Sequence, residues 1–159
     1  MAWNVNGTPN TLGTAGTELD ITDLTAKKFN VFLNHITTST AHNIQLTYEN
    51  NSNSVYSTRT NSIGGSDTTT VNTTNVDSWS FGTGDEFMVH YNCSISGEEK
   101  LTMTHQVVAT VTGSGTSPAR TETIHKFVPS PDTNIERIDL HSTSGNYLST
   151  SNLTAFGTD

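Results

Sequence analysis

The sequence has little of what most function classes depend on. Its 159 residues include one cysteine, Cys93, and four prolines, and only seven lysines and arginines accompany 15 aspartates and glutamates. A single cysteine excludes an intrachain disulfide framework. With a formal net charge of −8 and no basic cluster beyond Lys27 and Lys28, the chain has few cations to bind phosphates, so we do not expect nucleic acid as a partner.

Long apolar runs and a leader pattern are also missing. No stretch approaches the ~18 apolar residues of a membrane-spanning helix, and residues 1–6 have neither the charged nor the apolar region of a signal peptide. We therefore expect no membrane partner and no secretion through a signal peptide.

Small uncharged polar residues take the place of the missing classes. Hydrophobic residues make up 31% of the chain and charged residues 14%, against roughly 45–50% apolar and 25% charged in an average soluble domain. The chain instead has 30 threonines, 17 serines and 16 asparagines. Such totals alone are compatible with disorder, but threonine favours strands, so the pattern along the chain has to decide.

The clearest pattern is an alternation in the middle of the chain. The odd positions of residues 87–95 and 101–111 are mostly apolar, and the even positions are mostly polar, which predicts a long β-hairpin with the odd row buried and its threonines on the solvent face. Residues that face each other in an antiparallel pair lie on the same side of the sheet, so odd-numbered residues of one strand must pair with odd-numbered residues of the other, and the two numbers have an even sum. We expect Tyr91 opposite His105, with a three-residue loop at residues 97–99.

Shorter extended runs lie on either side of this hairpin. They cover residues 19–21, 29–36, 44–48, 55–59, 68–76 as a weak or edge strand, 79–81, 120–128, 134–141 and 148–156. The polar residues 50–53 predict a turn, and so a second hairpin between the runs that flank it. Only Ile135, Ile138 and His141 have the spacing of a short helix.

These runs predict an all-β chain, an antiparallel β-sandwich of jelly-roll-like type with roughly eight to ten strands. The length fits one domain. We expect residues 1–16 to be an N-terminal arm or edge segment and residues 17–159 to be a single β-sandwich domain.

Residues that could bind a metal are present but scattered. The six histidines are His35, His42, His90, His105, His125 and His141. None has the spacing of a zinc site, and an even-sum register places His90 and His105 on opposite faces. Calcium can use loop oxygens without a linear motif, and five aspartates lie at predicted strand ends: Asp20, Asp23, Asp67, Asp77 and Asp85. We interpret them as solubilising charges and expect no metal or other cofactor.

Catalytic patterns are equally weak. Residues 113–117 are rich in glycine and serine but do not fit G-x-S-x-G. The adjacent acids Glu98 and Glu99 lie at the predicted hairpin tip, and Asp85 and Glu86 open a strand, whereas glycoside hydrolysis needs two carboxyl groups about 5–10 Å apart across a sugar. We expect no catalytic residues and no enzymatic activity.

Sugar binding is the alternative that the aromatic residues leave open. Grooves in β-sandwiches bind sugars on aromatic platforms, and the available rings are Trp3, Tyr48, Tyr56, Trp79 and Tyr147. These numbers are also ordinary for a core, so a glycan is an open partner and not the main expectation.

Several short motifs in the last two thirds of the chain are familiar. They are Ser96-Gly97-Glu98-Glu99-Lys100-Leu101, Ser117-Pro118-Ala119-Arg120-Thr121-Glu122-Thr123, Ile135-Glu136-Arg137-Ile138 and Ser151-Asn152-Leu153-Thr154-Ala155-Phe156-Gly157. Together they resemble small jelly-roll structural proteins of tailed phages from marine environments. Residues 12–16 and 27–29 fit the same pattern more loosely.

This resemblance implies a non-enzymatic virion structural protein with no catalytic residues to carry over. The sequence contains no heptad shaft or collagen-like run of the kind that a stand-alone tail fibre uses. We therefore expect an oligomeric capsid decoration or head-surface protein, made in the host cytoplasm and located on the virion. Its partners would be further copies of itself, for example in a trimer, and viral capsid proteins. The alternative is a tail appendage or a receptor- or carbohydrate-binding jelly-roll module.

Overall fold

The computed structural model describes residues 2–62, 64–94, 99–108, 114–115, 120–131 and 133–159. Strands and connecting loops make up the described residues, and no helix occurs among them. The strands are β1 (Asn4–Val5), β2 (Asn10–Thr11), β3 (Glu18–Ile21), β4 (Phe29–Thr38), β5 (His42–Tyr48), β6 (Tyr56–Ser62), β7 (Thr68–Thr73), β8 (Val76–Phe81), β9 (Gly84–Ser94), β10 (Lys100–Val108), β11 (Arg120–Phe127), β12 (Ile138–Ser142) and β13 (Asn152–Thr158).

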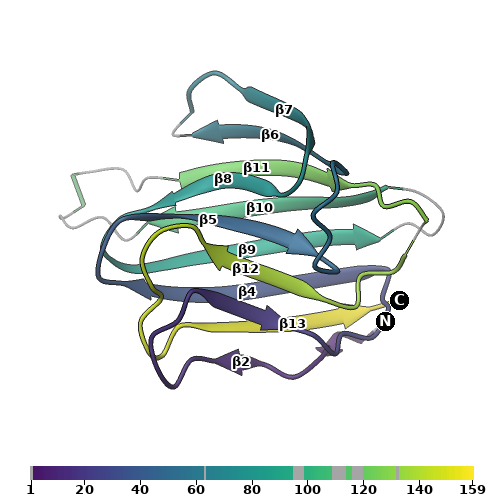
Figure 1. Cartoon of the computed structure of the whole chain (residues 1–159), viewed down its shortest axis with the longest axis horizontal. Helices are drawn as coiled ribbons and strands as arrows, with labels where there is room; N and C mark the ends of the chain where they lie inside the picture. The colour runs from purple at the N-terminus through teal and green to yellow at the C-terminus, as the bar shows by residue number, and fades with distance from the viewer. Residues whose placement is uncertain (1, 63, 95–98, 109–113, 116–119, 132) are drawn as a thin grey trace.

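The strands form two antiparallel sheets that face each other (Figure 1). The nine-stranded sheet has the order β1-β13-β4-β9-β10-β11-β6-β7, with β2 also paired to β13, and the four-stranded sheet has the order β3-β12-β5-β8. From β3 onward the chain crosses repeatedly between the sheets, and β12 returns to lie between β3 and β5. This confirms the predicted jelly-roll-like β-sandwich. The structure has more strands than predicted, partly because β1 and β2, at two residues each, are too short to be predicted from alternation.

The first residues of the chain run along the outer edge of β13. The backbone N–H of Asn6 donates to the carbonyl of Ala155 at 2.9 Å, and that of Leu12 donates to Ser151 at 2.9 Å. The side chain of Asn6 is buried and bonds Asn30 and the backbone of Thr25. Residues 2–16 therefore add two short strands to the edge of the nine-stranded sheet.

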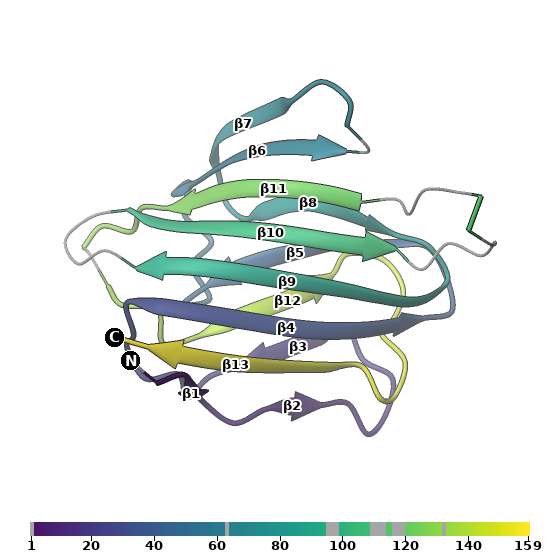
Figure 2. The ribbon, with the colours of Figure 1, turned by 180° about the vertical axis from the view of Figure 1, so that it is seen from behind.

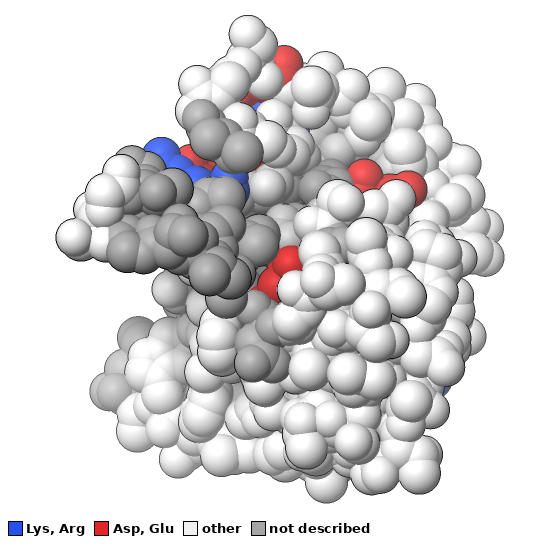
Figure 3. All heavy atoms as spheres, turned by 90° about the vertical axis from the view of Figure 1, so that its left-hand side faces the viewer, with Lys and Arg blue, Asp and Glu red and all other residues white. Residues whose placement is uncertain are grey.

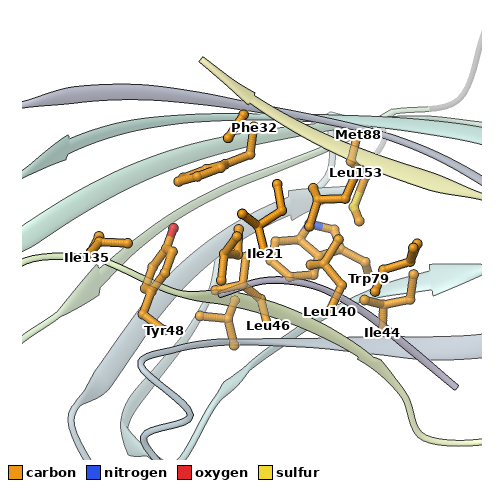
Figure 4. Close-up of a cluster of buried hydrophobic side chains, with 14 of the residues drawn as sticks. Ile21, Phe32, Ile44, Leu46, Tyr48, Trp79, Met88, Ile135, Leu140 and Leu153 are labelled. Atoms are coloured by element: carbon orange, nitrogen blue, oxygen red, sulfur yellow. The ribbon is translucent and has the colours of Figure 1, made fainter. Parts of the chain in front are cut away.

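Apolar side chains from both sheets fill the space between them. Figure 4 shows Phe32, Met88 and Leu153 projecting from the nine-stranded sheet toward Leu46 and Leu140 of the four-stranded sheet. All five are at most 1% exposed. Mutual burial of these two faces is the main source of hydrophobic stabilisation, and it leaves the opposite face of each sheet pointing outward.

Two predicted local features differ from the structure. Residues 50–53 do form a turn region, but β5 and β6 lie in different sheets, so the predicted second hairpin between them is wrong. The turn is a crossover of the jelly roll, which has the same turn residues as a hairpin. The helix considered at Ile135 to His141 is absent, because Ile138 begins β12 and Ile138 and Leu140 alternate as strand residues of the core.

The central hairpin is confirmed as β9 and β10, but its register is shifted. Tyr91 lies opposite Met103, and His105 lies opposite Val89. Odd-numbered residues do pair with odd-numbered residues, as expected. The expected pairing of Tyr91 with His105 is wrong by two positions. The predicted loop at residues 97–99 lies largely outside the described residues, as do most of the glycine- and serine-rich residues 113–117.

The most important correction concerns which face of this hairpin is buried. The even positions Met88, His90 and Gln106 are at most 1% exposed, whereas Phe87 and Tyr91 of the odd row are 52% and 49% exposed. The apolar row predicted for the core is on the outside of the sandwich. The threonines predicted for the solvent face, such as Thr102 and Thr104, point into it.

Candidate docking surface

The outer face of the nine-stranded sheet is the most unusual surface of the protein. Figure 2 views it from this side, with β13, β4, β9, β10 and β11 in front of the four-stranded sheet. Of twelve exposed large apolar side chains among the described residues, eight lie on this face of four adjacent strands. They are Phe29 and Leu33 of β4, Phe87 and Tyr91 of β9, Leu101, Met103 and Val107 of β10, and Ile124 of β11. We call this set the apolar face.

The pairing register places these side chains in rows that cross the sheet. One row runs from Phe156 through Val31, Tyr91 and Met103 to Ile124, since each of these residues lies opposite the next. Side chains at paired positions lie on the same side of the sheet and only ~5 Å apart. The exposed residues therefore form one continuous patch rather than isolated apolar positions.

Rings of histidine and aromatic residues order this surface. His35 stacks on Phe87 with ring centroids 4.9 Å apart, and Tyr91 meets His105 edge-on at 6.2 Å. The Nε2 atom of His105 lies 3.2 Å from the sulfur of Met103. Cys93 has a free, half-buried thiol on the same face. Side chains that contact one another in this way lose less entropy when a partner binds than isolated ones do.

Charged residues of both signs line the β11 border of the apolar face. Lys126 pairs with Glu99 at 3.1 Å, and Arg120 lies 3.6 Å from Glu122. Arg59, which lies opposite Ile124 on the neighbouring strand β6, pairs with Asp67 at 3.1 Å. Cations and anions therefore balance there, although the whole chain carries a net charge of −8.

The inner face of the same strands explains why the apolar row lies outside. His90 Nδ1 and the hydroxyl of Thr104 are 2.8 Å apart, and His90 Nε2 lies 3.1 Å from the amide nitrogen of Asn34. The Oδ1 atom of Asn34 accepts from the backbone N–H of Met88, so its amide nitrogen donates to His90 and the ring proton is on Nδ1. Burial lowers the pKa of His90 to about 3, which keeps the ring neutral.

Thr102 and Gln106 of this inner layer also have hydrogen-bond partners. The hydroxyl of Thr102 lies 2.9 Å from that of Tyr48, which belongs to the opposite sheet, and it accepts from the Asn92 amide at 2.9 Å. Gln106 donates to Glu86 at 3.1 Å, and Glu86 also accepts from the backbone N–H of Gly82 at 2.8 Å. Burial raises the pKa of Glu86. Since partners are present, burying these polar groups costs far less than burying them alone.

The sequence of β4, unlike that of the hairpin, does indicate that the nine-stranded sheet has apolar side chains on both faces. Phe32 and Ile36 are buried, while Phe29 and Leu33 on the alternate positions are exposed. A strand with apolar residues on both faces indicates two covered surfaces. In the monomer only one of these surfaces is covered.

No family model, curated protein or solved structure matches this chain. Its function therefore has to be inferred from its own residues. Among the part of the chain that the structure describes, no helix is long and apolar enough to cross a membrane.

One acidic cluster has the spacing of a cation site. Glu18, Asp20 and Asp139 place carboxylate oxygens within 4.8 Å of one another. The Nη2 atom of Arg137, however, lies 3.5 Å from Glu18 and from Asp20 and 2.5 Å from Asp139. The guanidinium is the counter-ion of the cluster, and its hydrogen bond to Asp139 raises the pKa of Arg137.

The other predicted site residues stay apart. Of the strand-end aspartates whose side chains the structure describes, only Asp20 belongs to the acidic cluster, while Asp23 binds Thr8 and Asp67 binds Arg59. His90 and His105 are on opposite faces, as expected. Among the described residues no histidine belongs to a group of potential metal ligands.

The aromatic residues considered for sugar binding are mostly inside the protein. Tyr48, Tyr56 and Tyr147 are fully buried, Trp79 is 1% exposed, and only Trp3 is well exposed, at 50%. Four of the five rings therefore cannot form a platform for a sugar. A groove of about 390 Å³ does lie beside Trp79, lined mainly by threonine and serine hydroxyls of β6, β7 and β8.

Proposed function

We propose that the protein is a non-enzymatic structural subunit of a virion, most specifically an oligomeric decoration or head-surface protein of a tailed phage. The apolar face is the observation that supports this role. The largest continuous apolar patch on the surface of a protein is often a site where a partner binds. The jelly-roll-like sandwich and the sequence resemblance to small phage structural proteins are consistent with the same role.

The interior gives a second physical reason for assembly. Much of the inner layer of β9, β10 and β11 is polar, with Thr102, Thr104 and Thr123 at most 1% exposed. Such an interior gains less hydrophobic stabilisation per residue than an aliphatic core. Covering the apolar face in an assembly would add the missing burial.

Purified particles that carry this gene test the proposal. We expect the protein in many copies per particle by quantitative mass spectrometry, on the head surface by electron microscopy with a specific antibody. Its absence from particles washed free of loosely bound protein would contradict the proposal. Detection only at the tail would support the alternative of a tail appendage.

A receptor- or carbohydrate-binding module is the second candidate, and the groove beside Trp79 is the observation that favours it. Thr58, Thr60 and Thr70 line this groove together with Asp77, and hydroxyl and carboxylate groups suit the hydrogen bonds of a sugar. A glycan array probed with the full chain, with and without calcium, tests this candidate. Retained binding by a Thr60→Val and Asp77→Asn double variant would exclude this groove as the site.

A further inference from the structure

We infer that the apolar face is covered by a second copy of this chain, stacked face to face across a two-fold axis. Such a contact is isologous, since each copy presents the same patch. It would place four sheets in a row, with the two nine-stranded sheets in the middle. Stacked sheets lie about 10 Å apart, which leaves room for one interlocked layer of side chains.

The shape of the apolar face is complementary to the same face of a second copy. Phe29, Phe87 and Tyr91 are 41%, 52% and 49% exposed and project from the sheet, whereas Val31 and Val89 between them are only partly exposed. Projections and hollows alternate on a single surface. A two-fold rotation can therefore seat the rings of one copy over the smaller side chains of the other, as in the core of a sandwich.

The distribution of charge selects this face for self-association. Copies with a net charge of −8 repel each other, and the repulsion is weakest where cations and anions balance. Arg59, Arg120 and Lys126 provide that balance at the border of the apolar face. The four-stranded sheet instead carries the acidic cluster of Glu18, Asp20 and Asp139, so contact through that side is disfavoured.

Figure 3 shows a third side, one end of the sandwich, where the described surface is largely uncharged.

The area is sufficient for a specific dimer. The apolar face and the adjoining strand β13, whose Phe156 lies opposite Val31, together cover five strands with about seven residues of each. At ~4.8 Å per strand and ~3.3 Å per residue this gives a planar footprint of about 550 Å². Two copies would bury about 1,100 Å² before the corrugation of the side chains is counted. Specific interfaces bury at least about 1,000 Å².

Because the dimer rests on the structural role proposed above, its test is made on the purified full chain without particles. Sedimentation velocity should give twice the monomer mass of 17.1 kDa. Val107→Asp, near the end of β10, and Leu33→Asp, in β4, should each raise the dimer dissociation constant on the order of 100-fold, because every substitution occurs twice in a two-fold interface. Asn43→Asp is the matched control, since it adds the same charge at an exposed position of β5 in the four-stranded sheet, and it should leave the mass unchanged.

Cys93 provides an independent measurement of the covered face. Its half-buried thiol lies on the apolar face, so a maleimide should label it slowly at high protein concentration and faster on dilution. In Val107→Asp the rate should be fast at every concentration while the circular dichroism spectrum stays that of the wild type. Loss of the spectrum would mark unfolding, and Leu33→Asp then replaces it as the test variant.

Three outcomes would overturn the dimer. They are a wild-type chain that stays monomeric at about 100 µM, a dimer that survives both Val107→Asp and Leu33→Asp, and a larger oligomer insensitive to both substitutions. A monomer whose Cys93 becomes protected only when particles are added would assign the apolar face to a capsid protein instead. A dimer that is absent from particles would leave the inference intact and refute the proposed function.

Discussion

Trp79 meets His90 edge-on inside the sandwich, with ring centroids 5.6 Å apart and planes at 86°. A second histidine, His125, lies 6.2 Å from the same indole. Two imidazoles and an indole thus occupy space that aliphatic side chains fill in most β-sandwiches. Neither ring nitrogen of His125 has a hydrogen-bond partner among the described residues. The stability of the protein should therefore depend on keeping these rings neutral.

The first prediction is acid sensitivity caused by His90 and His125. Burial lowers the pKa of each to about 3, from 6.5 in the unfolded chain. Above pH 6.5 the folded and unfolded states bind the same number of protons at these sites, but below it only the unfolded state gains them, so stability is lost as the pH falls toward 3. Urea titrations at pH 7 and pH 5 should differ by about 2 kcal/mol per histidine. Glu86, whose pKa is raised by burial, acts in the opposite direction and offsets part of the loss.

A substitution separates these histidines from other acid effects. His125→Leu should remove about half of the loss between pH 7 and pH 5, because one of the two buried imidazoles is gone. His141→Leu, which changes an exposed histidine, should keep the wild-type difference. An unchanged pH dependence in His125→Leu would contradict the burial of a neutral ring.

The second prediction tests which face of the hairpin is inside. Thr104→Val should lower the free energy of unfolding by about 1–3 kcal/mol, although it replaces a polar residue with an apolar one of similar size, because the proton on His90 Nδ1 loses its acceptor. Thr69→Val on the exposed edge strand β7 is the control and should have little effect. Chemical denaturation at pH 7 measures both. A stabilised Thr104→Val would show that the even row is on the outside.

The third prediction concerns the guanidinium of Arg137. Arg137→Gln should lower the free energy of unfolding by about 1–3 kcal/mol, because it leaves the carboxylates of Glu18, Asp20 and Asp139 facing one another, and Asp139 is only 3% exposed. Arg59→Gln removes an exposed pair and should not change the melting temperature measurably. A wild-type melting temperature that rises with millimolar calcium would indicate instead that the carboxylates bind a cation.

The fourth prediction concerns the attachment of the N-terminal segment. Gly7 has a φ of +76°, and a Cβ there would lie 2.6 Å from the side chain of Ile21 and 3.0 Å from Asp23. Gly7→Ala should therefore destabilise the protein by about 1–3 kcal/mol and expose the segment to limited proteolysis. Gly13→Ala, with nothing within 4 Å of the new methyl group, should be cut no faster than the wild type.

Much of the secondary structure could be predicted because alternation is a local property. Residues 44–48, 79–81 and 120–128 were expected as strands, and apart from Val128 they lie in β5, β8 and β11. Which strands pair is not local. Tyr48 and Tyr56 flank the same turn, yet the strands that contain them enter different sheets, because a crossover and a hairpin use the same turn residues.

The sequence by itself determined that the chain is an all-β sandwich with two-faced strands. Only the tertiary structure decided which face of β9 and β10 is covered. The polar row can be the inner one because Asn34 and Tyr48, which lie 54 or more residues away in the chain, form hydrogen bonds with His90 and Thr102. Period-two alternation defines two faces but not the partner of each. The apolar row thus remained outside as the largest uncovered apolar surface among the described residues, and it is the surface on which the proposed assembly depends.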